Sequence, residues 1–173
     1  NWFIENQDGG VNPHDEIDDP FKSAEVLQAH VDEGLKFARK NRLPKPIANF
    51  IPEHQGTLKM GYFLNKAEEK KLNFNESDFR YKGPIPQSKE TAILMLADGC
   101  EAALRAMDIN ASDSEALETI SKIVNSRETD GQLNDSNLSK GEIFLIKKSF
   151  LNVWKRIRHR RIQYPTTKNN TFS

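Results

Sequence analysis

The sequence has one cysteine, few histidines, no net charge and no long apolar stretch. The single cysteine, Cys100, excludes an intrachain disulfide and fits a reducing compartment. The 25 basic and 25 acidic side chains cancel, which argues against a strongly basic nucleic-acid-binding protein. No apolar stretch approaches the ~20 residues that a membrane-spanning helix needs. Any metal or acid–base site must therefore use carboxylates and the four histidines, His14, His30, His54 and His159.

Apolar residues recur at helical spacing along most of the chain, and no segment shows the alternation of a β-strand. Ser23, Ser88 and the Ser139–Glu142 capping box are candidate helix starts, and Gly131 is placed to follow a helix C-terminus. We therefore expect an all-α fold. Its six helices are predicted at about residues 23–41, 46–56, 58–72, 88–108, 114–130 and 139–161.

Asp98 lies within a nearly continuous apolar segment, residues 92–100, which predicts a buried helix. A buried carboxylate is costly unless it is paired or bound to a metal. Arg105 lies two turns further along the same face and is a candidate partner. A salt bridge and a metal site are therefore both open interpretations of Asp98.

His30 and His54 both fall at the edge of an apolar helical face, three and four residues after apolar side chains. A single histidine in such a position is more often a core residue than a ligand. Two of them, together with Asp98 on a third helix, indicate a His/His/Asp cluster. Imidazole and carboxylate ligands together suit zinc, iron or manganese.

The basic segment 155–161 has two interpretations. It could contact nucleic acid or an anionic membrane. We favour a cation-rich helix C-terminus, which the helix dipole stabilises, because the whole chain is neutral. We therefore expect no DNA or RNA partner.

Several motifs together resemble one protein family. They occupy residues 3–7, 12–15, 53–57, 79–90, 95–103, 130–133 and 161–165. The block Arg-Tyr-Lys-Gly-Pro-Ile-Pro-Gln at 80–87 is the most specific of them. In these motifs the chain resembles the HD domain of the PgpH-type seven-transmembrane HD proteins. The resemblance implies an HD-domain helical bundle over residues 1–165, and we expect a flexible tail at 166–173.

The resemblance also implies a function. Members of this family are bacterial membrane proteins whose cytosolic HD domain hydrolyses cyclic di-AMP to 5′-pApA. The resemblance implies two divalent metal ions, iron or manganese, which hold the attacking water without a separate catalytic base. It further implies a location at the cytoplasmic face of the inner membrane, with a transmembrane anchor outside this chain.

Five residues receive roles from the resemblance. By motif position, His30, His54 and Asp98 match metal ligands. Arg80 and Tyr81 are candidates for holding the dinucleotide, by charge and by stacking respectively. The alternative for these two residues is that they fix the loop in which they lie.

The chain departs from the family pattern at two places. Gln55 stands where the family has the second histidine of a His-His-Gly-Thr motif, and a neutral amide is a poorer ligand for transition metals. The family's adjacent His-Asp metal pair is also not visible, since the His14-Asp15 dipeptide belongs to another motif. We expect the pair to precede Asn1. These departures leave open a second function, a degenerate HD domain that binds a cyclic dinucleotide without hydrolysing it.

Overall fold

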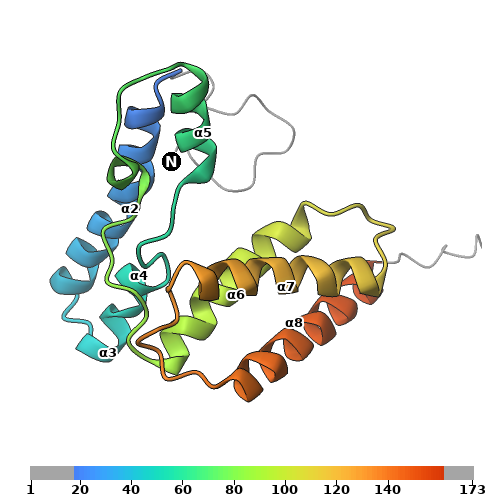
Figure 1. Ribbon diagram of the computed structural model, residues 1–173. Helices are drawn as coiled ribbons and strands as arrows, with labels where there is room; N and C mark the ends of the chain where they lie inside the picture. Colours follow the sequence, from blue (N-terminus) through green and yellow to red (C-terminus); the bar gives the residue numbers. More distant parts are fainter. Residues whose placement is uncertain (1–17, 162–173) are drawn as a thin grey trace, which may run out of the picture. The chain divides into compact units, whose positions relative to one another are not determined.

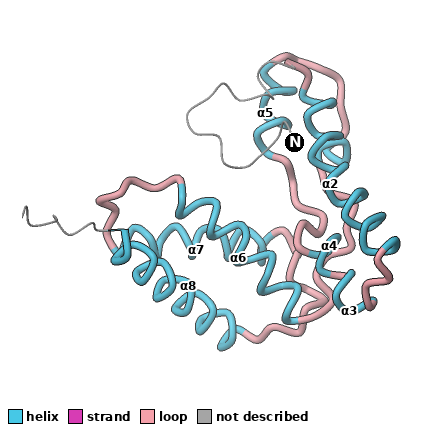
Figure 2. Tube along the Cα trace, turned by 180° about the vertical axis from the view of Figure 1, so that it is seen from behind, coloured by secondary structure: helices cyan, strands magenta, loops and turns pink. Residues whose placement is uncertain are grey.

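A computed structural model describes residues 18–161, with the side chains of residues 18–158. This part consists of helices joined by loops, without an extended strand (Figures 1 and 2). The predicted all-α fold class is therefore confirmed. The described residues divide into two compact units, one formed by residues 18–95 with 127–138 and the other by residues 96–126 with 139–161. No helix in the described part combines the length and apolar character that a membrane crossing requires.

The first unit opens with α2, Pro20–Lys40. The side chain of Asp19 accepts a hydrogen bond from the backbone N–H of Phe21 at 3.0 Å, and a proline occupies the first helical position. The prediction that Ser23 caps this helix is wrong. Ser23 is buried one turn inside the helix, because the Asp-Pro pair starts the helix earlier.

Short helices follow α2 in the first unit. The helix predicted at 46–56 is present as two pieces, α3 (Lys45–Ala48) and α4 (Phe50–Glu53). The next elements are α5 (Gly61–Glu69) and a 3-10 helix, η1 (Glu76–Phe79). Helix α2 packs against α4, α5 and η1. The core of this unit is formed by Ala24, Met60, Phe63, Ala67 and Phe79.

A short antiparallel backbone pairing joins the segments before α5 and after η1. The Met60 N–H donates to the Phe79 carbonyl at 2.8 Å, and the Tyr81 N–H donates to the Leu58 carbonyl at 3.1 Å. The side chain of Gln28, on α2, also donates to the Arg80 carbonyl at 2.9 Å. These bonds fix the Arg80–Tyr81 backbone between α2 and the segment that leads into α5.

Helix α6, Lys89–Arg105, begins after Ser88, whose hydroxyl accepts from the Thr91 N–H at 3.2 Å. Its buried side consists of Ala92, Met95, Leu96 and Cys100. The prediction of a helix buried on all sides is wrong, because Ile93, Leu94 and Asp98 are exposed in the described part. The buried positions follow a spacing of three and four residues, so they cover one face and leave the other face open.

The second unit also contains α7, Asp113–Thr129, and α8, Lys140–Arg161. The predicted capping box at the start of α8 is confirmed. The Ser139 N–H donates to the Glu142 carboxylate at 2.9 Å, and the Glu142 N–H donates to the Ser139 hydroxyl at 3.2 Å. Gly131 follows α7 with φ of +74°, as its predicted place after a helix C-terminus requires.

Replacing Phe79 by alanine tests the core of the first unit. Phe79 is fully buried and its ring lies 5.1 Å from Phe21 and 5.5 Å from Phe74 between centroids. We expect Phe79→Ala to lower the free energy of unfolding by about 3–5 kcal/mol, because it leaves a cavity. Urea unfolding followed by circular dichroism measures this change. The matched control Phe37→Ala removes a 69% exposed ring of the same unit and should shift the free energy by under about 0.5 kcal/mol.

Candidate functional site

Three rings from separate segments gather in the first unit. His30 lies on α2, His54 follows α4, and their ring centroids are 5.7 Å apart. Tyr81 lies edge-on to His30 with centroids 5.9 Å apart. His30 is exposed, whereas His54 and Tyr81 are half-buried. The structure thus brings together two of the predicted ligands and one predicted substrate residue, and their roles stay predictions.

The ring of His54 is oriented by the backbone of the preceding turn. Its Nδ1 lies 2.7 Å from the Ile51 carbonyl and 3.1 Å from the Phe50 carbonyl. A carbonyl only accepts hydrogen bonds, so Nδ1 carries a proton, and in the neutral ring Nε2 then presents a lone pair. Metal-binding histidines are commonly oriented in this way through their second nitrogen. Gln55 places its amide nitrogen 3.3 Å from that Nε2, where it donates a hydrogen bond.

The residues present fit a divalent transition metal in part. Two neighbouring imidazoles are suitable ligands for zinc, iron or manganese, and the Gln55 amide offers a weaker oxygen ligand. Among the residues whose side chains are described, no three His, Cys, Asp or Glu side chains converge as a metal site. Further ligands are therefore needed to complete the coordination of any ion held by His30 and His54.

Asp98 belongs to the second unit and is exposed on α6. The prediction that the Asp98 carboxylate is buried, and therefore needs a partner, is wrong, because Asp98 lies on the exposed side of the helix. Arg105 lies 3.7 Å from Glu101, one turn away on the same helix. The motif position of Asp98 is thus the remaining support for its role as a ligand.

Arg80 is engaged by three neighbours within the first unit. Its Nη1 and Nη2 atoms donate to the two carboxylate oxygens of Asp130 at 3.2 and 3.0 Å. Nη1 also donates to the Thr57 carbonyl at 2.7 Å, and Nε donates to Glu76 at 2.9 Å. These contacts support the interpretation that Arg80 fixes the loop, rather than that it holds the dinucleotide.

The Arg80–Asp130 pair is half-buried, and each partner stabilises the charge of the other. The hydrogen bonds from Arg80 lower the pKa of Asp130, and a hydrogen bond from Gln132 contributes in the same direction. The Asp130 carboxylate in turn raises the pKa of Arg80. Both groups therefore stay charged throughout the neutral pH range.

Gln132 is a buried residue that the sequence analysis did not select. Its side-chain oxygen accepts from the Thr57 N–H at 3.0 Å. Its amide nitrogen donates to the Thr57 hydroxyl at 2.9 Å and to Asp130 at 2.8 Å. The available signal was its place in the 130–133 motif, which carried the resemblance but received no role.

Glu53 is a second buried residue that the sequence analysis missed, although it directly precedes His54. It is 2% exposed, and one carboxylate oxygen accepts from the Gln87 N–H at 2.9 Å and from the Thr91 hydroxyl at 2.7 Å. Hydrogen bonds to a carboxylate are stronger than those between neutral groups. Glu53 therefore joins the turn that carries His54 to the start of α6.

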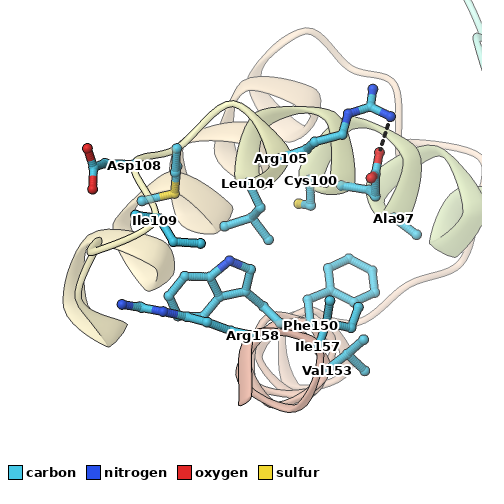
Figure 3. Close-up of a pocket in the computed structure, with 13 residues that line it drawn as sticks. Ala97, Cys100, Leu104, Arg105, Asp108, Ile109, Phe150, Val153, Ile157 and Arg158 are labelled. Carbon is cyan, nitrogen blue, oxygen red and sulfur yellow. Dashed lines mark ion pairs between the residues drawn. The ribbon is translucent and has the colours of Figure 1, made fainter. Parts of the chain in front are cut away.

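Two cavities accompany these residues, one in each unit. The first unit contains a small cavity of about 50 Å³ beside Gly56 and Tyr81, which is large enough to admit water. In the second unit, α6 and α8 line a cavity of about 390 Å³ (Figure 3). Leu104, Phe150 and Ile157 point into it, and none of the histidines whose side chains the structure describes lines it. The larger cavity thus lacks the imidazoles of the candidate site.

The basic segment on α8 has partners within the second unit. Lys155 pairs with Asp113 at 2.6 Å. Arg158 donates to the Ala111 carbonyl and lies over the Trp154 ring, with its guanidinium carbon 5.0 Å from the ring centroid. These contacts support the structural interpretation of the segment. The His14-Asp15 dipeptide, the His159 side chain and the 166–173 tail lie outside the described residues.

Comparisons with known proteins give relatives in bacteria, although no family model matches the chain. An uncharacterized protein of Synechocystis is 47% identical over 168 residues, which cover 94% of this chain and 21% of the relative. The cyclic-di-AMP phosphodiesterase PgpH of Listeria monocytogenes is 36% identical over 97% of this chain and 23% of its own. The cyclic-di-AMP phosphodiesterase PgpH of Bacillus subtilis is 37% identical over 95% of this chain and 23% of its own. The chain thus spans 21–23% of the length of these curated relatives.

Two solved structures of the PgpH HD domain of L. monocytogenes resemble this chain closely. The first has a TM-score of 0.83 at 34% identity and covers 91% of this chain and 73% of its own. The second, in complex with cyclic-di-AMP, has a TM-score of 0.84 at 34% identity and covers 90% and 72% respectively. This chain and the solved HD domain therefore share both sequence and fold over most of their lengths.

Replacing Asp130 by asparagine tests the Arg80–Asp130 pair. At pH 7 we expect Asp130→Asn to lower the free energy of unfolding by about 1–3 kcal/mol, because Arg80 loses the more buried of its two carboxylate partners and keeps only Glu76. The pKa of Asp130 is depressed below its ordinary 3.8, so the pair contributes fully above pH 3.8 and is lost as the pH falls through the lowered pKa. Urea unfolding from pH 7 to pH 3 should show the difference between wild type and variant shrinking below pH 3.8.

The exposed Asp135 provides the control for this measurement. Its carboxylate accepts from the Gln87 side chain at 3.0 Å at the surface, so Asp135→Asn should cost under about 1 kcal/mol. If Asp130→Asn lowered the free energy of unfolding as much at pH 3 as at pH 7, the result would contradict the assigned pair.

Proposed function

Because the chain belongs to the PgpH family of HD-domain phosphodiesterases, we propose that it forms the hydrolytic domain of a cyclic-di-AMP phosphodiesterase. The match to the solved HD domain in complex with cyclic-di-AMP carries this proposal. The neighbouring imidazoles of His30 and His54 support it independently, since they were selected from residue pattern as well as motif position. The reaction adds one water across a phosphodiester bond and yields the linear dinucleotide 5′-pApA.

We assign four residues to metal binding in this proposal. His30, His54 and Asp98 are the ligands, and Gln55 takes the position where the family motif has histidine. Two divalent ions, iron or manganese, suit this combination of imidazole and carboxylate. When bound, such ions stabilise charge on the phosphate and lower the pKa of water.

Residues of this chain orient His54 and offer a surface on which the nucleotide could bind. The Ile51 carbonyl holds the Nδ1 proton of His54, so Nε2 is available as an electron-pair donor. Tyr81 stands beside His30 and offers an aromatic ring for an adenine base. Stacking of this kind is worth about 1–3 kcal/mol per base in nucleic-acid-binding proteins. Arg80 acts indirectly, by holding the turn that follows Gln55.

A second candidate function is binding of the cyclic dinucleotide without hydrolysis. The contact of the Gln55 amide with His54 Nε2, at 3.3 Å, favours it, because this amide donates to the nitrogen that would bind a metal. A neutral amide oxygen is also a weaker ligand than imidazole. The two functions differ in turnover, whereas both require nucleotide binding.

The proposal extends to the setting of the domain. We propose that residues 1–165 constitute one HD-type domain of a membrane-anchored protein, at the cytoplasmic face of the bacterial inner membrane. The anchor belongs to sequence outside this chain, as the relatives are more than four times longer. The neutral charge balance is in keeping with a small nucleotide as the partner and with no DNA or RNA.

Removing the imidazole of His54 tests the hydrolytic function. In the full-length protein loaded with Mn²⁺, we expect His54→Ala to lower the rate of 5′-pApA formation by more than about 100-fold, since even residues that support metal ligands contribute about 10–100-fold. Chromatographic product analysis measures the rate. His159→Ala, a histidine with no place in the proposed site, should retain the wild-type rate. Undiminished hydrolysis by His54→Ala would refute the assignment.

Replacing Gln55 by histidine separates the two candidate functions. If the chain hydrolyses cyclic di-AMP with Gln55 as an adequate ligand, Gln55→His should change turnover by less than about threefold. If it is a binding module, the wild type should bind the nucleotide without turnover, and Gln55→His should gain Mn²⁺ affinity by about tenfold or more. Titration calorimetry with Mn²⁺ and with cyclic di-AMP, alongside product analysis, distinguishes these outcomes.

A further inference from the structure

The turn that follows His54 and Gln55 depends on glycine at position 56. Gly56 has φ of +52°, a conformation that side-chain-bearing residues rarely adopt. A Cβ atom there would lie 2.5 Å from the side-chain oxygen of Gln132 and 2.6 Å from the terminal carbon of Met95. Both distances are too short for real contacts. The glycine therefore lets the backbone approach the Gln132 side chain, and that approach sets the path of the turn.

Thr57, the next residue, is held at each of its polar atoms. Its N–H donates to Gln132 at 3.0 Å, its hydroxyl accepts from Gln132 at 2.9 Å, and its carbonyl accepts from Arg80 at 2.7 Å. The Gln132 carboxamide thus bonds the backbone and side chain of one residue together. Such paired bonds fix both the position and the rotation of the Thr57 peptide.

The orientation of Gln132 is itself determined by a charge. Its amide nitrogen donates to Asp130 at 2.8 Å, and Asp130 is held by two hydrogen bonds from Arg80. A carboxylate accepts but does not donate, so it selects the amide nitrogen and turns the amide oxygen toward the Thr57 N–H. Gln132 is fully buried, so water does not compete for these bonds.

The other end of the same segment is held by Glu53. Its buried carboxylate accepts from the Gln87 N–H and the Thr91 hydroxyl at the start of α6. His54 and Gln55 therefore lie between two anchored residues, Glu53 and Thr57. With both ends fixed, the directions of these two side chains are limited to those that the short turn allows.

We propose that Gln132 is a positioning residue, which acts through Thr57 to aim His54 and Gln55 toward the metal and substrate. Asp130 and Arg80 hold Gln132 in the one orientation that serves this purpose. The role in catalysis rests on the proposed function, whereas the role in orienting His54 does not. Residues that orient metal ligands commonly contribute about 10–100-fold to metal affinity or activity.

Two variants remove the contact in different ways. Gln132→Leu keeps the approximate size of the side chain and loses its hydrogen bonds. Thr57→Val keeps the β-branched shape and loses only the hydroxyl, so it tests the same contact if Gln132→Leu does not fold. Thr57→Ser is the conservative rescue, because it keeps the hydroxyl that Gln132 bonds.

Three measurements follow each variant. Without metal, ring nitrogen and carbon NMR signals of His54 report its tautomer and surroundings. Calorimetry gives the Mn²⁺ affinity, and kinetics on the full-length protein give kcat and KM for cyclic di-AMP. For Gln132→Leu we expect the His54 NMR signal to shift or divide. The Mn²⁺ affinity and kcat should each fall about tenfold or more, whereas KM should change by less than about threefold. Thr57→Val should change the His54 signal, the Mn²⁺ affinity and kcat in the same direction by a smaller factor. Thr57→Ser should show wild-type values.

The control for a merely structural effect is Ser136→Ala. Ser136 is fully buried in the same segment, and its hydroxyl donates to the Leu133 carbonyl at 2.7 Å and accepts from the Leu138 N–H at 3.3 Å, so both hydrogen bonds stay within that segment. Ser136→Ala should lower the free energy of unfolding and leave the His54 NMR signal unchanged. An unshifted His54 signal with unchanged Mn²⁺ affinity in folded Gln132→Leu and Thr57→Val would overturn the proposal. Absence of hydrolysis by the wild type would instead refute the proposed function, while a shifted His54 signal would still support the positioning role.

Discussion

The hydrogen-bonded pair of Arg80 and Asp130 is the interaction on which the candidate site depends. It joins the end of η1, the turn after His54 and the segment after α7, which lie far apart in the sequence. A half-buried guanidinium without its carboxylate would lose charge-assisted hydrogen bonds that water could replace only in part. The pair also sets the hydrogen-bond direction of Gln132, and through it the backbone of Thr57. The turn that carries His54 is thereby held in place, as its proposed role as a metal ligand requires.

The same arrangement explains why several polar groups in the first unit are buried. Glu53 and Gln132 each occupy a site where desolvation would be costly without partners, and each has at least two. The partners of Glu53 are the Gln87 N–H and the Thr91 hydroxyl at the start of α6. Those of Gln132 are the N–H and hydroxyl of Thr57, in the turn after His54, and the Asp130 carboxylate. The stability of this region is thus coupled to the geometry of its imidazole. A substitution that loosens one anchor is therefore expected to affect both folding and the candidate chemistry.

Helix-capping residues and the spacing of apolar side chains, which are local features of the sequence, predicted much of the fold. The Ser139–Glu142 capping box starts α8 as expected, and Gly131 follows α7 with the positive φ that its position demands. Local rules failed where two signals competed: Asp19 and Pro20 start α2 before Ser23 does. They failed again on α6, where an apolar composition suggested burial on all sides. The composition could not show that the buried residues would occupy one face and leave Asp98 exposed.

For the site, the residue pattern selected His30 and His54, and the structure places their rings side by side. The sequence by itself determined the helical class, the ends of several helices and the chemical types of the candidate ligands, because these follow from spacing and local hydrogen bonding. Only the tertiary structure decided what Arg80, Gln132 and Glu53 do. Each has partners that lie between 23 and 75 residues away along the chain, and a side chain's hydrogen bonds to such distant groups depend on how the whole unit packs.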